Sequence, residues 1–301
     1  MDEVRYISRF SPDFPEKLKN IPDPPAGIYV KGRLPDENVK TVAIVGARNC
    51  SQYGRKLAEF FASNLASAGV QVISGLARGI DGIAQINSIK AGGSTWGVLG
   101  CGIDYVYPES NRYIYEETLK KGGLISEYEG VRPPLRAFFV QRNRLISALC
   151  DVLLVIEAKE RSGTSITVRN ALMQGKDIFA VPGRLTDPLS AGCNRLIAQG
   201  AGIALNPETI LMALDRSLNE PLIATANRKI CAGGQIKCGK IVLTGDEKKI
   251  YSLLDLYPKT LDEIVSSSGL GVSETLRIIL DLRLKDLVTE CAKNNYIRNH
   301  L

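Results

Sequence analysis

Histidine is almost absent from this sequence, and its cysteines are scattered. The one histidine, His300, lies next to the C-terminus, and no two of the seven cysteines have Cys-x-x-Cys spacing. Neither a zinc cluster nor a Ser-His-Asp triad can be built from such residues. We therefore expect no metal, no cofactor and no catalytic residue, and a reducing compartment.

Long apolar runs are lacking too. No stretch approaches the roughly 20 apolar residues that a membrane-spanning helix needs, so we expect a cytoplasmic protein without a membrane contact. With 45% hydrophobic and 23% charged residues, the 301-residue chain has the composition of an ordinary globular protein. Its net charge of +6 suits an acidic partner, although surplus lysine on a solvated face is equally common.

One strand–turn–helix segment organises the rest of the chain. Residues 41–45 predict a buried strand, Gly46 ends it, and a helical pattern covers residues 51–68. A helix that begins at the carboxyl end of a strand directs free N–H groups there, which suits an anion, and Arg48 adds a positive charge. The segment favours a phosphate contact, although a purely structural tight turn stays open.

The two common nucleotide-binding loops do not match this turn. A dinucleotide site needs Gly-x-Gly-x-x-Gly and an acidic residue at the end of the second strand. Here Gly46 and Gly54 lack the middle glycine, and the second strand ends in Ser74-Gly75. A P-loop would need Gly-Lys-Ser/Thr, which does not follow. A dinucleotide and a P-loop nucleotide are therefore not expected.

Strands and helices alternate from residue 41 onward. Strands are expected at 41–45, 70–74, 94–99, 123–126, 152–156, 178–181 and near 203–205, with helices at 51–68, 79–91, 109–121, 141–149, 164–174 and 194–199. Apolar strands separated by helices indicate a parallel sheet covered on both faces. The predicted fold is α/β, with a Rossmann-like, doubly wound, mostly parallel sheet at 41–218. The proline-rich residues 1–40 are predicted to be an irregular extension with one short helix near 15–20.

Ligands of such a sheet bind beyond the carboxyl ends of its strands. Glycines, hydroxyls and arginines are frequent where the expected strands end. The candidate residues at this edge are Gly46, Arg48, Ser51, Gly75, Arg78, Gly79, Ser162, Gly163 and Thr164. Their convergence favours a phosphate-rich ligand more strongly than any one loop does.

Residues 136–144, Arg-Ala-Phe-Phe-Val-Gln-Arg-Asn-Arg, interleave arginines with phenylalanines. Cations that meet phosphates and rings that stack on bases are typical of single-strand binding surfaces. In an extended segment Phe138 and Phe139 would point to opposite faces, so one can fill the core while the other faces the arginines. The alternative is that the rings are core and the arginines form salt bridges. The candidate residues here are Arg136, Phe139, Arg142, Asn143 and Arg144.

The C-terminal part has a different pattern. Residues 226–240 carry four cations and no acid, so 219–243 are expected to be an exposed basic linker. Helices at 246–256, 261–267 and 273–285, the last with Ser273 as its N-cap, and strands at 287–290 and 296–298 predict a winged helix over 244–301. This domain has eight Lys/Arg against nine Asp/Glu, a poor balance for duplex DNA. A protein contact or a weak accessory role is expected.

Several segments together resemble one family along almost the whole chain. They are VAIVGAR at 42–48, SGLARGID at 74–81, VLGCGID at 98–104, RNR at 142–144, VIEA at 155–158, SGT at 162–164 and FAVPG at 179–183. On these residues the chain is similar to the bacterial DNA processing protein A family (DprA, also called Smf).

The resemblance implies a function and a site. Proteins of this family bind and protect incoming single-stranded DNA in natural transformation and recombination, load the RecA recombinase, and form homodimers through the Rossmann-like domain. The single-strand pocket of the family corresponds here to Arg48, Arg136, Phe139 and Arg142, with Phe139 as the exposed ring.

Two other functions compete with this one. A nucleotide phosphoribohydrolase of the related cytokinin-activating group shares this type of sheet, but its catalytic glutamate would fall at Thr167, and threonine cannot serve as the acid or base. A duplex-DNA regulator would need a basic third helix in the winged helix, whereas Glu274 and Asp281 roughly cancel Arg277 and Arg283. A single-stranded-DNA-binding protein without enzymatic activity is the favoured hypothesis.

Overall fold

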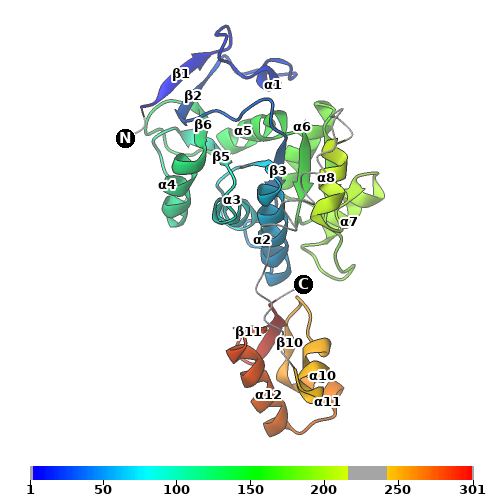
Figure 1. The fold of residues 1–301 in the computed structure, drawn as a ribbon. Coiled ribbons are helices and arrows are strands. Elements are labelled where there is room, and N and C mark those ends of the chain that lie inside the picture. The colour runs from blue at the N-terminus through cyan, green and yellow to red at the C-terminus, as the bar shows by residue number, and fades with distance from the viewer. Residues whose placement is uncertain (1–2, 216–242, 300–301) are drawn as a thin grey trace. The chain divides into compact units, whose positions relative to one another are not determined.

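The computed structural model describes residues 3–215 and 243–299 of the chain (Figure 1). The chain divides into two compact units, Met1–Gly233 and Gly234–Leu301, and each is described here by itself. The expected basic linker at 219–243 lies, except for its last residue, outside the described residues. Within the described ranges, no helix has both the length and the apolar character needed to cross a membrane.

The first unit is built on one nine-stranded sheet with the order β1-β2-β6-β5-β4-β3-β7-β8-β9. Neighbouring strands from β6 to β9 pair in parallel. Strands β3, β4, β5 and β7 are buried along their whole length because helices cover both faces. The bounds of the parallel strands are β3 (Thr41–Val45), β4 (Gln71–Ser74), β5 (Thr95–Gly102), β6 (Gly123–Tyr128), β7 (Val152–Val155), β8 (Asp177–Ala180) and β9 (Gly202–Ile203).

Helices alternate with these strands, as the doubly wound prediction requires. Figure 1 shows α2 and α3 side by side on one face of the sheet and α5 and α6 side by side on the other. The predicted α/β fold with a mostly parallel sheet is thereby confirmed. The helices are α2 (Gln52–Ser67), α3 (Ile80–Lys90), the 3-10 turn η1 (Glu109–Asn111), α4 (Arg112–Lys121), α5 (Arg136–Leu149), α6 (Thr164–Met173), α7 (Ala191–Ala198) and α8 (Pro207–Asp215).

The N-terminal 40 residues are not the irregular extension that their prolines suggested. β1 (Arg5–Ser8) and β2 (Gly27–Gly32) pair antiparallel, and β2 pairs antiparallel with β6, so both strands widen the sheet. All six prolines of this segment lie outside the two strands, where their missing N–H interrupts no strand pairing. The expected short helix is present as α1 (Glu16–Lys19).

Helix α5 begins five residues earlier than the pattern indicated. A Pro-Pro pair and the extended N-cap Leu135 precede it, and the helix starts directly at Arg136. Neighbouring side chains on a helix lie about 100° apart instead of on opposite faces. Phe138 and Phe139 are accordingly both half-buried, and the idea that one of them fills the core is wrong.

The second unit has the predicted three helices and two strands, together with a short additional strand. Its sheet has the order β10-β12-β11. Its elements are α10 (Gly245–Leu253), β10 (Lys259–Thr260), α11 (Leu261–Ser268), α12 (Val272–Leu284), β11 (Val288–Ala292) and β12 (Asn295–Arg298). Capping boxes formed by Thr244 with Glu247 and by Thr260 with Glu263 begin α10 and α11.

The connection between α11 and α12 is shorter than expected. Gly269 ends α11 in the left-handed conformation, with φ +67°, and Gly271 is already the extended N-cap of α12. The prediction of Ser273 as this N-cap is therefore wrong, because Ser273 lies inside the first helical turn.

The left-handed glycine allows a test of this connection. We expect Gly269→Ala to lower the free energy of unfolding of the second unit by roughly 1–2 kcal/mol, because an L side chain is disfavoured at this φ. Gly245→Ala is the matched control, since Gly245 lies in α10 and a Cβ at either position meets no atom within 4 Å. Hydrogen exchange of the α11 and α12 amides in the full chain measures the effect. Equal losses in both variants would contradict this role.

Candidate nucleic-acid interface

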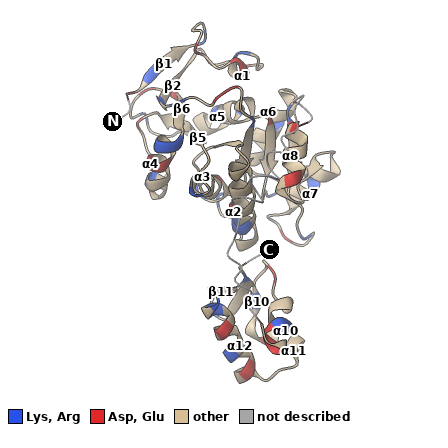
Figure 2. Cartoon of the chain, in the orientation of Figure 1, with Lys and Arg blue, Asp and Glu red and all other residues tan. Residues whose placement is uncertain are grey.

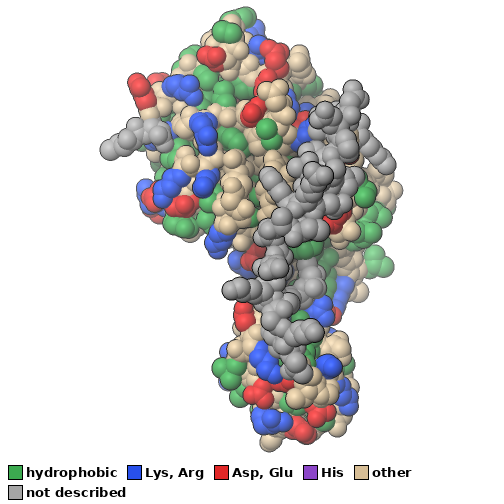
Figure 3. All heavy atoms as spheres, viewed as in Figure 1, with side chains coloured by type: hydrophobic (Ala, Val, Ile, Leu, Met, Phe, Trp, Pro, Cys, Tyr) green, Lys and Arg blue, Asp and Glu red, His purple; other side chains and the backbone are tan. Residues whose placement is uncertain are grey.

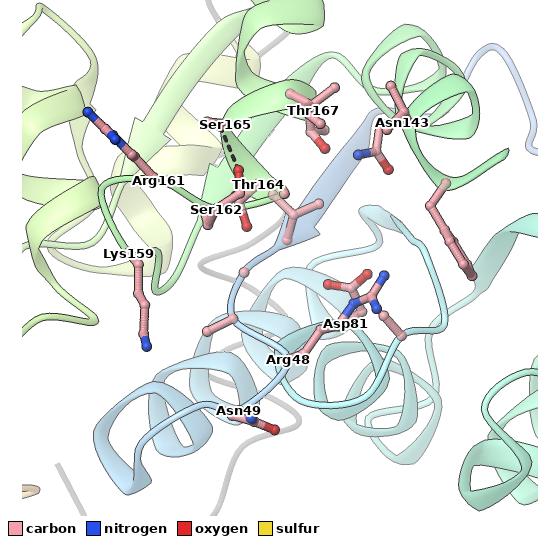
Figure 4. A pocket seen from close by; sticks show the side chains of 18 of the residues that line it. Arg48, Asn49, Asp81, Asn143, Lys159, Arg161, Ser162, Thr164, Ser165 and Thr167 are labelled. Carbon is pink, nitrogen blue, oxygen red and sulfur yellow. Dashed lines mark hydrogen bonds between the residues drawn. The ribbon is translucent and has the colours of Figure 1, made fainter. Parts of the chain in front are cut away.

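The order of the sheet reverses at β3, which has β4 on one side and β7 on the other. Doubly wound sheets bind ligands outside the carboxyl ends of the strands at such a switch point. A pocket of about 1350 Å³ lies there and is called the switch-point pocket below. The β3–α2 loop, the first half of α5 and the β7–α6 loop line it (Figure 4).

A buried carboxylate holds the start of α2 behind this pocket. Glu157, which follows β7 and is 1% exposed, accepts hydrogen bonds from the backbone N–H of Ser51, at 2.9 Å, and from its hydroxyl. The Ser51 hydroxyl accepts a hydrogen bond from the Gly54 N–H at 3.0 Å and so caps the helix. Burial raises the pKa of Glu157, while the hydrogen bonds from Ser51 oppose the rise. Ser51 is thus a helix cap and does not line the pocket.

Two of the predicted glycines shape the loop that carries Arg48. Gly79 has φ +83°, and a Cβ there would lie 2.3 Å from the Ala47 carbonyl oxygen. A Cβ on Gly46 would lie 2.9 Å from the Glu157 carbonyl oxygen. Both positions therefore need glycine so that the starts of α2 and α3 and the end of β7 can approach one another. Gly46 lines the pocket, whereas Gly79 is not part of its lining.

Phe139 forms one wall of the pocket between two arginines. The guanidinium carbons of Arg48 and Arg142 lie 5.2 Å and 5.7 Å from the centre of its ring. The Tyr107 ring lies 5.6 Å away, centre to centre. Arg136 lines the same pocket from the first turn of α5, and no ion pair holds it within the described part of the chain. One aromatic face and several cations thus converge here, as predicted.

Arg142 lines the pocket but is 4% exposed and held from behind. Its Nη1 donates hydrogen bonds to the carbonyl oxygen of Gly75, at 2.9 Å, and to that of Val98. Asp81, also buried, accepts a hydrogen bond from the Gly75 N–H at 3.1 Å. Burial raises the pKa of Asp81, and the charge of Arg142 opposes the rise. Arg142 therefore ties α5 to the end of β4 and to the middle of β5, and Gly75 is needed because a Cβ there would meet Arg142 and Asp81 at 2.8 Å.

Two predicted arginines do not reach the pocket. Arg144 is 9% exposed and forms ion pairs with Glu127 at 2.5 Å and Asp23 at 3.1 Å. Arg78 is exposed and donates a hydrogen bond to Asn49 at 2.7 Å. For Arg144 the alternative of a structural salt bridge is the one that the structure supports.

The loop before α6 forms the opposite wall. Ser162, Gly163 and Thr164 line the pocket, as does Asn143 on α5. The structure therefore brings together nine of the predicted residues, namely Gly46, Arg48, Arg136, Phe139, Arg142, Asn143, Ser162, Gly163 and Thr164. It leaves five outside the pocket lining, namely Ser51, Gly75, Arg78, Gly79 and Arg144.

Some lining residues were not predicted. Lys159 and Arg161 precede Ser162 on the β7–α6 loop, and their place directly after a buried strand is the signal that could have found them. Thr167, on the second turn of α6, lines the pocket at the position where the rival hydrolases carry glutamate. Within residues 3–215 and 243–299, no group of three or more His, Cys, Asp or Glu side chains could hold a metal ion.

Comparisons with known proteins agree with this architecture. The family model of DNA recombination-mediator protein A matches residues 5–215, and the model of the DprA winged helix domain matches residues 240–292. The DNA processing protein DprA of Bacillus subtilis is 38% identical over 212 residues, which cover 70% of this chain and 71% of that protein.

Two solved structures share the fold at moderate identity. DNA processing protein A from Streptococcus pneumoniae has a TM-score of 0.67 at 36% identity, over 70% of this chain and 74% of that chain. DNA processing protein A from Helicobacter pylori, whose structure describes a single-stranded DNA binding mode, has a TM-score of 0.64 at 30% identity, over 72% of this chain and 99% of that chain. The chain therefore belongs to the DNA recombination-mediator protein A (DprA) family and carries that family's winged helix domain.

Proposed function

We propose that this protein binds single-stranded DNA in the switch-point pocket and acts as a recombination mediator without enzymatic activity. The observation that carries the proposal is the position of the Phe139 ring, which lines the pocket between the guanidinium groups of Arg48 and Arg142. A ring flanked by cations can stack on a base while the cations attract the adjoining phosphates. Only an unpaired base offers its face to such a ring, which favours a single strand over a duplex.

The other predicted residues support the proposal to different degrees. Arg48 and Arg136 are the cations best placed to meet phosphates, because neither forms an ion pair within the described residues. Arg142 contributes its charge from the back wall, with one nitrogen bound to backbone carbonyls. Asn143, Ser162 and Thr164 add polar side chains from the facing walls.

The second unit gives little support to a duplex-DNA regulator. On α12, Arg277 pairs with Asp281 at 3.5 Å, and Arg283 pairs with Glu290 at 2.8 Å. Figure 2 shows both signs of charge on this helix, and Figure 3 shows them intermixed on the visible face of the unit. Strong binding to duplex phosphates needs several unpaired cations, so a protein contact is the more plausible role of the winged helix.

An enzymatic role is not favoured either. Thr167 stands where the nucleotide hydrolases of the related group carry their glutamate, and its hydroxyl cannot act as a general acid or base near neutral pH. Hydrolysis of AMP by the purified protein would overturn this part of the proposal.

The two pocket arginines should act as phosphate contacts. We expect Arg48→Ala and Arg136→Ala each to weaken binding of single-stranded DNA. Each should also reduce the steepness of the slope of log affinity against log salt by about 0.7. The reason is that a phosphate no longer met by a cation keeps its counterions when the strand binds. Arg112→Ala is the control, since Arg112 is an exposed residue of α4 that pairs with Glu109 and does not line the pocket. Fluorescence anisotropy over a salt series measures both quantities, and unchanged slopes in both pocket variants would place the phosphate contacts elsewhere.

The two neighbouring phenylalanines should differ in binding. Phe139→Ala should cost about 1–3 kcal/mol in affinity for single-stranded DNA, because a stacking surface is lost. Phe138 is the matched neighbour, since its ring stacks on Tyr128 at 3.9 Å and does not line the pocket. Both rings are half-buried, so melting temperatures should fall by similar amounts. A Phe138→Ala variant that loses as much affinity as Phe139→Ala would sink the stacking role.

We further propose that the protein forms a homodimer through its first unit and loads RecA onto the bound strand, as the family relationship suggests. Loading requires that the mediator holds the strand. Phe139→Ala should therefore slow RecA filament assembly on single-stranded DNA incubated with the protein, to an extent that follows its loss of affinity for the strand. Assembly kinetics with purified RecA measure this effect. Full stimulation by a variant that no longer binds the strand would separate loading from the pocket.

A further inference from the structure

The two helices that begin at the switch point differ in how their N-termini are satisfied. The N-terminus of α2 has its own anion, because the Glu157 carboxylate binds the Ser51 N–H and hydroxyl. Helix α6 has no acidic residue in its first turn and no side-chain cap. The partial positive charge at the start of α6 is therefore left for an external anion.

Buried threonines whose hydroxyls have no described partner lie beside this N-terminus. Thr164 is 9% exposed and Thr167 is 3% exposed, both line the pocket, and no described residue hydrogen-bonds to either hydroxyl. The Ser162 hydroxyl is also buried without a described partner. By contrast, the Ser165 hydroxyl donates to the Ser162 carbonyl at 2.5 Å. Ser162, Thr164 and Thr167 all line the pocket, so a ligand that enters it can pair with their hydroxyls.

The Asn143 side chain faces the same hollow from α5 and adds a donor to those of Thr164 and Thr167. The Asn143 carbonyl oxygen accepts a hydrogen bond from Arg142 Nε at 3.2 Å, which leaves the Asn143 amide nitrogen free to donate. Figure 4 shows Asn143, Thr164 and Thr167 around one hollow, with Arg48 on its other side. Lys159 and Arg161 line the pocket from the loop before α6.

The carboxylates near this hollow do not compete with an anion for its donors, because each binds another group. Asp81 accepts the Gly75 N–H and lies beside the buried Arg142. Asp187 accepts the Leu189 N–H at 2.9 Å. Glu160 forms an ion pair with Arg195 at 2.5 Å. Each of these acids is thus engaged by a neighbouring group.

We propose that this subsite, formed by the start of α6 with Thr164, Thr167 and Asn143, binds a terminal phosphate monoester. The proposal rests on the function proposed above and specifies what its pocket recognises. A monoester has three terminal oxygens and a charge near −2 at neutral pH, which suits three donors at a helix N-terminus. The group must enter far enough to meet the hydroxyls of two threonines that are more than nine-tenths buried. An internal phosphodiester is linked on both sides and would have to bring two nucleotides into the hollow, whereas a monoester brings one.

The ligand has two possible sources, the phosphorylated end of a DNA strand and a free nucleotide, and three matched pairs of ligands distinguish them. The pairs are one oligothymidylate with a 5′-phosphate or a 5′-hydroxyl, the same oligomer with a 3′-phosphate or a 3′-hydroxyl, and thymidine 5′-monophosphate against thymidine. We expect the phosphorylated member of at least one pair to bind about tenfold tighter, which corresponds to about 1.4 kcal/mol, because the donors of the subsite form charge-assisted hydrogen bonds with the monoester. The pair that shows the preference identifies the source.

Variants that remove one hydroxyl without changing shape connect the preference to the subsite. Thr164→Val and Thr167→Val should each lower the ratio of the two affinities toward one. Thr118→Val is the matched control, because Thr118 in α4 is also a buried threonine with an unpaired hydroxyl but does not line the pocket. Melting temperatures of the three variants check that folding is preserved.

The outcomes separate this inference from the function on which it rests. Equal affinities within all three pairs would overturn the subsite, and so would valine variants that weaken both members of a pair by the same factor. If oligomers bind and none of the three pairs shows a preference for the phosphate, single-strand binding stands and the terminal subsite falls. If only the mononucleotide binds and no oligomer does, the subsite stands and the strand-binding proposal falls.

Discussion

The buried guanidinium group of Arg142 is the contact on which the rest of the site depends. It reaches from α5 to the backbone carbonyls of Gly75, which follows β4, and of Val98, within β5, and it lies beside the buried carboxylate of Asp81. A charged group in such a place needs hydrogen bonds and a counter-charge, and the structure supplies both. Because α5 is held at this point, Phe139, one turn earlier on the same helix, faces the pocket and the Arg48 loop.

Close approach of backbone segments accounts for the glycines around the pocket. Backbone segments from β3, β4, β7 and α3 come so close that a Cβ at Gly46, Gly75 or Gly79 would meet neighbouring atoms at less than 3 Å. Close approach of these segments brings helix N-termini and cations to one edge of the sheet. Of the two helices that follow β3 and β7, α2 receives its anion from Glu157, and α6 does not receive one from the described residues. This asymmetry is what leaves room for an external anion.

Sequence patterns predicted the order of elements well and their local details less well. The alternation from β3 onward, the winged helix and most strand bounds are confirmed. β1 and β2 were missed because the proline content of their connections dominated the composition of residues 1–40. The start of α5 was missed because arginines next to phenylalanines have no clear periodicity over so few residues. In both places, pairing and packing with distant parts of the chain decided the local structure.

By itself, the sequence determined the fold class, the edge of the sheet at which the candidate residues gather, and the family, because these follow from the order of apolar strands, glycine turns and motifs. Only the tertiary structure decided which cations are available there. Arg48, Arg136, Arg142 and Arg144 are equivalent in a sequence, but burial and neighbouring acids separate them. Arg144 is neutralised by Glu127 and Arg142 is bound to backbone carbonyls, whereas Arg48 and Arg136 line the pocket without an ion pair among the described residues. The physical reason is that desolvation and pairing depend on distances between residues far apart in the chain, and only the folded structure specifies those distances.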